Sequence, residues 1–191
     1  DHILAIWGTY LKAQGQLYHN TIVGTVMTNM GLDKYLEENS MKIVKADVGD
    51  RYVLEEMLSS GYVLGGEQSG HIIFLDYNTT GDGLATGLHL LEVIKASGKS
   101  LSSLNNLLTK YPQVLENALV KNDLKYKYLE NIEIRDEIKK VEDHFSGEGR
   151  VLIRPSGTEP LVRVMIEGKD EKEITKIARD LKEFIEARIG E

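Results

Sequence analysis

The stretch Arg154–Pro160 combines a guanidinium group, two hydroxyls and a glycine amide, and it is framed by two of the chain's three prolines. Because proline fixes φ and contributes no N–H, this stretch should hold one shape while its other donors point at one guest. The donors are those of Arg154, Ser156, Gly157 and Thr158. A guanidinium and convergent hydroxyls suit a compact oxyanion, so these residues predict a phosphate site.

An ordinary hairpin loop is the alternative for this stretch, because turn residues such as Gly, Pro and Ser need no ligand to explain them. Glu159 also opposes an anion, unless its carboxylate turns outward or pairs with Arg163.

A second candidate is the glycine-rich stretch 65–71, in which Glu67, Ser69 and His71 alternate. If the segment is extended, the three side chains point the same way. A carboxylate accepts hydrogen bonds, a hydroxyl donates and accepts them, and an imidazole can donate them. Together these groups suit the binding of sugar hydroxyls. The alternative is a glycine-rich bend between two strands, with polar side chains in water.

A third candidate is Val48–Arg51, between the end of a predicted strand and the start of a predicted helix, where α/β proteins often place ligands. Asp50 is more simply a helix cap, and the role of Arg51 stays open between substrate contact and surface charge. We expect no metal site and no catalytic nucleophile in this chain, because no histidine has a ligand spacing and no acidic cluster occurs.

Composition excludes several classes of function. The net charge of −7 disfavours a nucleic-acid-binding surface, and no apolar run is long enough to span a membrane. The chain has no cysteine, which removes disulfides and thiol nucleophiles and agrees with a reducing cytoplasm. The first residues, Asp1 and His2, lead straight into a helical pattern, so we interpret the sequence as a piece of a longer protein.

Strands and helices alternate over the first 110 residues, which predicts a compact α/β domain with a mixed sheet. The expected strands are 21–26, 41–45, 62–64 and 72–75, with the last one able to run antiparallel to the third. The expected helices are 3–11, 32–39, 51–59, one opened by Asp82 and closed by Gly98, and a short one ending near Lys110. The helix closed by Gly98 should bury a stripe of Leu84, Leu88, Leu91 and Ile94.

A new pattern begins after Tyr111-Pro112, so we place a boundary there and expect domains 1–111 and 112–191. Strands are expected at 114–120, 151–153 and 161–166, and helices at 135–145 and from 171 onward. In the last strand, Val162, Val164 and Ile166 should share one face, opposite Arg163, Met165 and Glu167. The last helix should have an apolar stripe of Ile174, Ile177, Leu181 and Ile185. An antiparallel sheet with helices on one face is an α+β arrangement.

The motifs Gly66–His71 and Arg154–Pro160, in this order, resemble those of the α-D-phosphohexomutase superfamily. The stretches 48–53 and 79–84, and Gln68 inside the first motif, resemble its bacterial phosphoglucosamine mutase branch. The resemblance covers nearly the whole chain. It implies that residues 1–111 are family domain 3, which binds the sugar, and that residues 112–191 are the TATA-binding-protein-like domain 4, which binds phosphate.

The resemblance also implies a function for the longer protein: glucosamine 6-phosphate and glucosamine 1-phosphate interconvert through a 1,6-bisphosphate, with Mg²⁺ as cofactor. The phosphoserine loop and the metal loop would lie in the missing domains 1 and 2, so this piece alone should be inactive. Glu67, Ser69 and His71 would contact the sugar, Arg154, Ser156, Gly157 and Thr158 the phosphate, and Asp50 and Arg51 could touch substrate. The alternatives are a phosphoglucomutase or phosphomannomutase of the same superfamily, or a non-catalytic sugar-phosphate-binding module.

Overall fold

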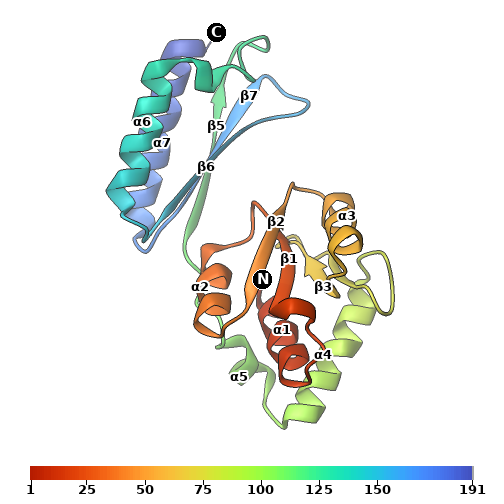
Figure 1. Ribbon diagram of the computed structural model, residues 1–191. Coiled ribbons are helices and arrows are strands. Elements are labelled where there is room, and N and C mark those ends of the chain that lie inside the picture. Colours follow the sequence, from red (N-terminus) through yellow and green to blue (C-terminus); the bar gives the residue numbers. More distant parts are fainter. Residues whose placement is uncertain (191) are drawn as a thin grey trace. The chain divides into compact units, whose positions relative to one another are not determined.

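Two compact units, each with its own hydrophobic core, make up the chain in the computed structural model, which describes residues 1–190 (Figure 1). The first unit is Asp1–Lys110 and the second begins at Tyr111. None of the helices in the described range is both long and apolar enough to cross a membrane.

The first unit is built around strand β1 (Thr21–Thr25), whose five residues are all buried. Strands β2 (Lys42–Ala46) and β3 (Leu64–Gly66) pair with β1 in parallel, and β4 (Ile72–Phe74) pairs antiparallel with β3. The strand order is β2-β1-β3-β4, so the sheet is mixed, as the sequence predicted.

Helices cover this sheet on both faces, because successive residues of β1 point to opposite sides. Ile22 belongs to the larger core, which includes Leu4 and Trp7 of the first helix, whereas Val23 packs with Val53 and Met57. The helices of this unit are α1 (His2–Ala13), α2 (Met30–Glu38), α3 (Asp50–Ser60), α4 (Gly83–Ser97) and α5 (Leu101–Asn105), with a short 3₁₀ turn, η1 (Tyr18–Asn20).

Two local predictions in this unit were wrong. Asp50 is the first residue of α3 and not its cap: the cap position is held by Gly49, whose φ of +133° suits glycine. Strand β3 begins at Leu64, two residues later than expected, and includes Gly65 and Gly66, which sequence patterns assign to a loop. Asp82 does cap α4, since its Oδ1 accepts from the N–H of Ala85 at 2.9 Å.

The predicted buried stripe of α4 was also wrong. Leu84, Leu88 and Leu91 are 76%, 60% and 60% exposed, although they share one helical face. The face of α4 toward the core carries Thr86 and Val93 instead, with Ile94 partly buried at its edge. A helix that is apolar on two sides does not reveal from spacing which side faces the core.

The second unit is a three-stranded antiparallel sheet with the order β5-β7-β6, in which β7 is central. Helices α6 and α7 lie side by side along this sheet (Figure 1). The elements are β5 (Gln113–Leu119), a 3₁₀ turn η2 (Tyr128–Glu130), α6 (Ile132–Phe145), β6 (Arg150–Pro155), β7 (Leu161–Glu167) and α7 (Glu171–Ile189). The core joins Val162, Val164 and Ile166 of β7 to the expected stripe of α7, of which Ile174, Leu181 and Ile185 are buried and Ile177 is partly buried.

Candidate functional site

The proline-framed stretch of the second unit joins two paired strands. Arg154 and Pro155 belong to strand β6, where they pair with Arg163 and Val162 of β7, so the loop itself is 156–160. The N–H of Ser156 donates to the carbonyl of Leu161 at 2.9 Å and closes the loop. Arg154 is therefore held by the sheet, which positions its guanidinium more firmly than a loop would.

The hydroxyl of Ser156 is used inside this loop. Ser156 is 3% exposed, and its Oγ accepts from the N–H of Glu159 at 3.2 Å. Gly157 and Thr158 are exposed at the tip. Of the four predicted phosphate contacts, Ser156 thus shapes the loop in this structure, while the groups at the tip face outward.

The guanidinium of Arg154 is partly buried and incompletely bonded. Its Nε is buried and has no hydrogen-bond partner among residues 1–190. Burial lowers the pKa of Arg154, and the positive charge of Arg163 on the neighbouring strand lowers it further. Two cations directly opposite each other on a sheet repel. An anion bound beside both guanidinium groups, on their solvent side, would relieve this repulsion.

Two more charged groups adjoin this loop. Arg163 Nη2 lies 3.5 Å from Glu159 Oε2, which is the pairing that would turn the carboxylate away from an anion. Lys125, only 4% exposed, donates from Nζ to the carbonyl of Glu159 at 3.2 Å. Sequence reasoning missed Lys125, because it stands among the similar residues Lys121 and Lys127 and only the fold brings it to the loop.

In the first unit, Glu67, Ser69 and His71 come together, but not for the reason expected from sequence. Residues 67–70 form a tight turn and not an extended segment: the N–H of Gly70 donates to the carbonyl of Glu67 at 3.1 Å. Ser69 Oγ lies 3.5 Å from Glu67 Oε2 and 3.4 Å from His71 Nδ1. His71 Nδ1 is 3.6 Å from the same carboxylate oxygen, so the three polar groups form a cluster.

Glu67 anchors this cluster to the loop before α3. It is 8% exposed, and its Oε1 accepts from the N–H of Gly49 at 3.0 Å. The contact joins the second and third candidate stretches, which are 18 residues apart in sequence. The other oxygen, Oε2, lies near Ser69 and His71, both of which are exposed, so the cluster reaches the surface through these two residues.

Two glycines of this motif serve packing. A Cβ added to Gly65 would lie 2.5 Å from Met57 Sδ, so β3 can approach α3 only without a side chain there. A Cβ on Gly66 would lie 2.6 Å from the carbonyl oxygen of His71, which accepts from the N–H of Glu67. The glycine pair therefore places the turn 67–70.

Asp50 and Arg51 do not join the cluster through their side chains. Asp50 Oδ1 accepts from the N–H of Arg51 at 2.8 Å. Arg51 Nε donates to Glu55 Oε1 at 2.7 Å, one turn along α3, and this bond raises the pKa of Arg51. The Arg51 side chain is 80% exposed, which agrees with a surface charge in this structure.

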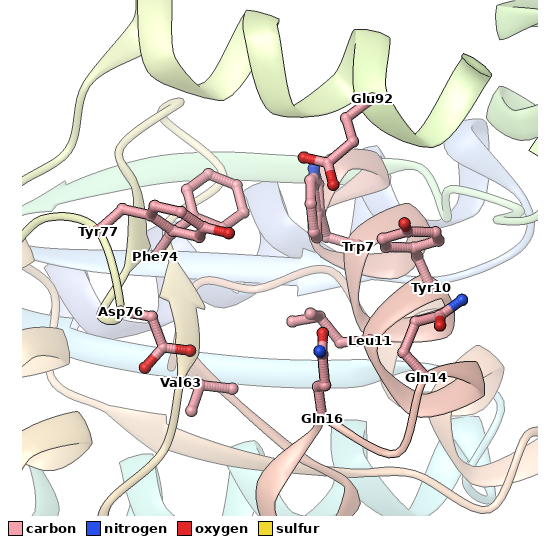
Figure 2. A pocket seen from close by; sticks show the side chains of 10 residues that line it. All are labelled: Trp7, Tyr10, Leu11, Gln14, Gln16, Val63, Phe74, Asp76, Tyr77 and Glu92. Atoms are coloured by element: carbon pink, nitrogen blue, oxygen red, sulfur yellow. The ribbon is translucent and has the colours of Figure 1, made fainter. Parts of the chain in front are cut away.

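No group of three or more His, Asp or Glu residues within 1–190 is arranged to hold a metal ion. Another histidine, His89 of α4, packs against the rings of Trp7, Phe74 and Tyr77, and its Nδ1 lies 3.6 Å from Glu92 Oε2. The three rings and Glu92 also line a cavity of about 430 Å³, whose lining includes none of the predicted site residues (Figure 2).

Comparison with known families and proteins agrees with the resemblance seen in the motifs. Residues 1–111 match the family model described as phosphoglucomutase/phosphomannomutase, alpha/beta/alpha domain III, and residues 115–184 match that of the C-terminal domain. A phosphoglucosamine mutase of Ruminiclostridium cellulolyticum is 62% identical over the whole chain, and that of Acetivibrio thermocellus is 60% identical. The chain spans 42% of the length of each of these relatives.

Solved structures show the same fold at lower identity. An N-acetylglucosamine-phosphate mutase in its substrate complex aligns over 97% of this chain and 43% of its own, with a TM-score of 0.78 and 20% identity. An Aspergillus fumigatus relative in complex with glucose 1,6-bisphosphate covers 96% of this chain and 42% of its own, with a TM-score of 0.77 and 16% identity. At these identities the likeness establishes the fold of both units.

Proposed function

The chain belongs to the phosphoglucomutase/phosphomannomutase family, and from that premise we propose that it is the substrate-binding part of a phosphoglucosamine mutase. Such an enzyme interconverts glucosamine 6-phosphate and glucosamine 1-phosphate. The relatives that are 56–62% identical over the chain carry this name, which favours the amino sugar over other hexoses. The observation that carries the proposal is the incompletely bonded guanidinium of Arg154 beside Arg163.

The second unit would hold the phosphate that is not reacting. Arg154 and Arg163 supply positive charge, and the exposed amides and hydroxyl at Gly157 and Thr158 supply further donors. The bisphosphate intermediate of this reaction must be held in two orientations. A site that contacts the phosphate group and makes few contacts with the sugar ring can accept both. Positioning of this kind matters to phosphoryl transfer, because the reaction depends on alignment and charge stabilisation.

The first unit would read hydroxyl groups of the sugar. Glu67 Oε2 would accept from a hydroxyl, and Ser69 and His71 provide exposed groups that can donate or accept. The N–H of Gly49 fixes Oε1, so the carboxylate keeps its orientation whether or not sugar is bound. Asp50 and Arg51 would supply a further contact, since they are the two residues that follow Gly49 in the chain.

The remaining chemistry would come from outside this chain. We propose that the rest of the longer protein supplies the phosphoserine that exchanges phosphate with the sugar, and the Mg²⁺ site that resemblance to the family implies. The described residues do not fit a Mg²⁺ site of their own, since no three of their carboxylates or imidazoles converge. We propose a cytoplasmic location for the longer protein, because sugar phosphates are made and used there.

The test is turnover by the longer protein that contains this chain. Glucosamine 6-phosphate should be converted at a higher kcat/KM than glucose 6-phosphate or mannose 6-phosphate. A preference for glucose or mannose phosphate would favour the second candidate, a phosphoglucomutase or phosphomannomutase, which the family description supports. No turnover of any of the three would leave a sugar-phosphate-binding module and refute the enzyme.

A further inference from the structure

Residues 120–128, between β5 and α6, are hydrogen-bonded to the second unit on both sides of the candidate phosphate site. At one end of this segment, the hydroxyl of Tyr128 donates to the carbonyl of Ile153 at 2.9 Å. Ile153 precedes Arg154 in β6, which is an edge strand of its sheet with β7 as its neighbour. Because the outer side of an edge strand has no neighbouring strand, this bond restrains the backbone beside Arg154 in a way that the sheet alone does not.

The rest of the segment is bound to the residues that close the loop 156–160. The N–H of Val120 donates to the carbonyl of Pro160 at 3.0 Å. Lys125 Nζ donates to the carbonyl of Glu159 at 3.2 Å. This carbonyl also accepts from the N–H of Leu161 at 2.9 Å, so it has a backbone partner without Lys125. The bond from Lys125 therefore adds a restraint on the loop beyond satisfying the carbonyl.

Both side chains place a polar group in the interior. Lys125 is 4% exposed, and Tyr128 is 9% exposed. Burial raises the pKa of Tyr128, so its hydroxyl keeps its proton and stays a donor near neutral pH. Lys125 Nζ also lies 5.2 Å from the centroid of the Tyr126 ring, but neither a ring nor a carbonyl neutralises its charge. An apolar residue at position 125 would avoid the cost of burying an ammonium, so the lysine contributes its bond to the loop and a positive charge beside it.

The tip of the loop lies between two restrained residues. The N–H of Glu159 donates to Ser156 Oγ at 3.2 Å, so both backbone groups of Glu159 are bound. A Cβ on Gly157 would meet no atom of the described chain within 4 Å. Because the space around Gly157 is open, the direction of the amides at the tip depends on how firmly Ser156 and Glu159 are held.

We propose that Lys125 and Tyr128 are positioning residues for the phosphate. Tyr128 fixes the backbone that carries the guanidinium of Arg154, and Lys125 fixes the returning side of the loop through Glu159. Together they set the distance between the guanidinium and the amides at the loop tip. A shift of about 1 Å weakens a site whose donors must meet one compact oxyanion. The inference rests on the proposed function, in which this loop binds the phosphate that is not reacting.

The experiment measures the Kd of the 191-residue protein for inorganic phosphate, at constant ionic strength, from the NMR shifts of the amides of Gly157 and Thr158. These shifts report on the folded protein, so a loss of stability alone would not change the Kd. Tyr128→Phe removes a hydroxyl and no charge, and it should raise the Kd by about fivefold. Lys125→Met should raise the Kd by at least as much, because it removes the bond to Glu159 and a nearby charge.

Two comparisons separate positioning from other effects. Lys127→Met removes the same charge from an exposed residue of the same segment, and it should bind phosphate like the wild type. In the Arg154→Met background, Tyr128→Phe should leave the Kd unchanged, because no guanidinium remains to be positioned.

The results distinguish the inference from the function on which it rests. If the wild type shows no saturable shift with phosphate, the proposed phosphate site fails and the inference fails with it. If the wild type binds phosphate and Tyr128→Phe binds it equally tightly, the site stands and the positioning role is overturned. The same holds if Tyr128→Phe weakens binding as much without Arg154 as with it. Tyr128→Phe decides the matter even if Lys125→Met does not fold.

Discussion

Replacing Arg154 by methionine should affect the stability of the free protein and its affinity for phosphate in opposite directions. The guanidinium Nε lacks a partner, and burial and Arg163 lower the pKa of Arg154, so the charged side chain is held in an unfavourable place. Methionine keeps much of the apolar stem and removes the like charge. Because Arg154 is only partly buried, the gain is small: we expect the free energy of unfolding to stay unchanged or rise by up to about 1 kcal/mol.

The affinity for phosphate should fall in the Arg154→Met variant, because a charged hydrogen-bond donor is lost. A hydrogen bond from a charged donor contributes about 1.5–3 kcal/mol, which corresponds to a loss of about 10- to 150-fold in affinity. The assay is urea unfolding of the 191-residue protein with and without inorganic phosphate, together with the NMR shifts of the amides of Gly157 and Thr158. Arg179→Met, an exposed arginine on α7, is the matched control and should retain the phosphate-induced stabilisation.

Two results would refute this reasoning. If Arg154→Met lowers the free energy of unfolding by more than about 1 kcal/mol, the side chain is a structural contact and not a strained, open donor. If the variant keeps the amide shifts of the wild type on addition of phosphate, the guanidinium does not hold the anion.

Three further predictions concern the positions that shape the sites. Glu67→Gln should lower the free energy of unfolding of the first unit by about 1–2 kcal/mol, because the bond from the Gly49 N–H loses its charged acceptor; urea unfolding followed by tryptophan emission measures it. Gly65→Ala should cost about 1–3 kcal/mol by crowding Met57, and the same unfolding curve reports it. Burial raises the pKa of Tyr128, so this residue stabilises the fold below a pH of about 10 and less as the pH rises through its folded pKa. Tyr128→Phe should therefore flatten the alkaline fall of stability, measured by unfolding at several pH values.

Matched changes control two of these predictions. Ser69→Ala removes an exposed hydroxyl that makes two long contacts, at 3.5 Å to Glu67 and 3.4 Å to His71, and should change stability by less than about 0.5 kcal/mol. Gly157→Ala adds a Cβ that meets no atom within 4 Å, so it should be as stable as the wild type while Gly65→Ala is not. A large loss in either control would mean that the loops themselves, and not the named contacts, limit stability.

The parts of the fold that could be predicted from sequence are those with one clear apolar face. The stripe of α7 points to a single core and was found as expected. Val162, Val164 and Ile166 of β7 also join that core, but Met165 and Glu167 on the other face are buried as well, so burial does not alternate along this strand. Helix α4 carries leucines on the side away from the core as well, and spacing alone cannot choose between two apolar faces. Strand β3 is Leu-Gly-Gly, which has almost no strand propensity and forms because its neighbours leave room only for glycine.

The candidate sites show a similar division. The residue types of the two motifs could be read from the chain, and the clustering of Glu67, Ser69 and His71 was predicted, although a turn and not an extended segment produces it. The proximity of Gly49 to Glu67 and of Lys125 to Glu159 could not be predicted, because each depends on how separate segments pack. Their roles in binding substrate stay predictions.

The glycine pair 65–66 bears on how such proteins are recognised from sequence. Met57 crowds a side chain at the first position and the carbonyl of His71 crowds one at the second, so packing alone favours glycine at both positions. A sequence signature that weights this pair therefore detects how tightly a strand lies on a helix, and does not by itself detect a binding site. A descendant that had lost its substrate would keep the glycines for as long as it kept the fold, and the polar residues that follow them are the better indicator of a working site.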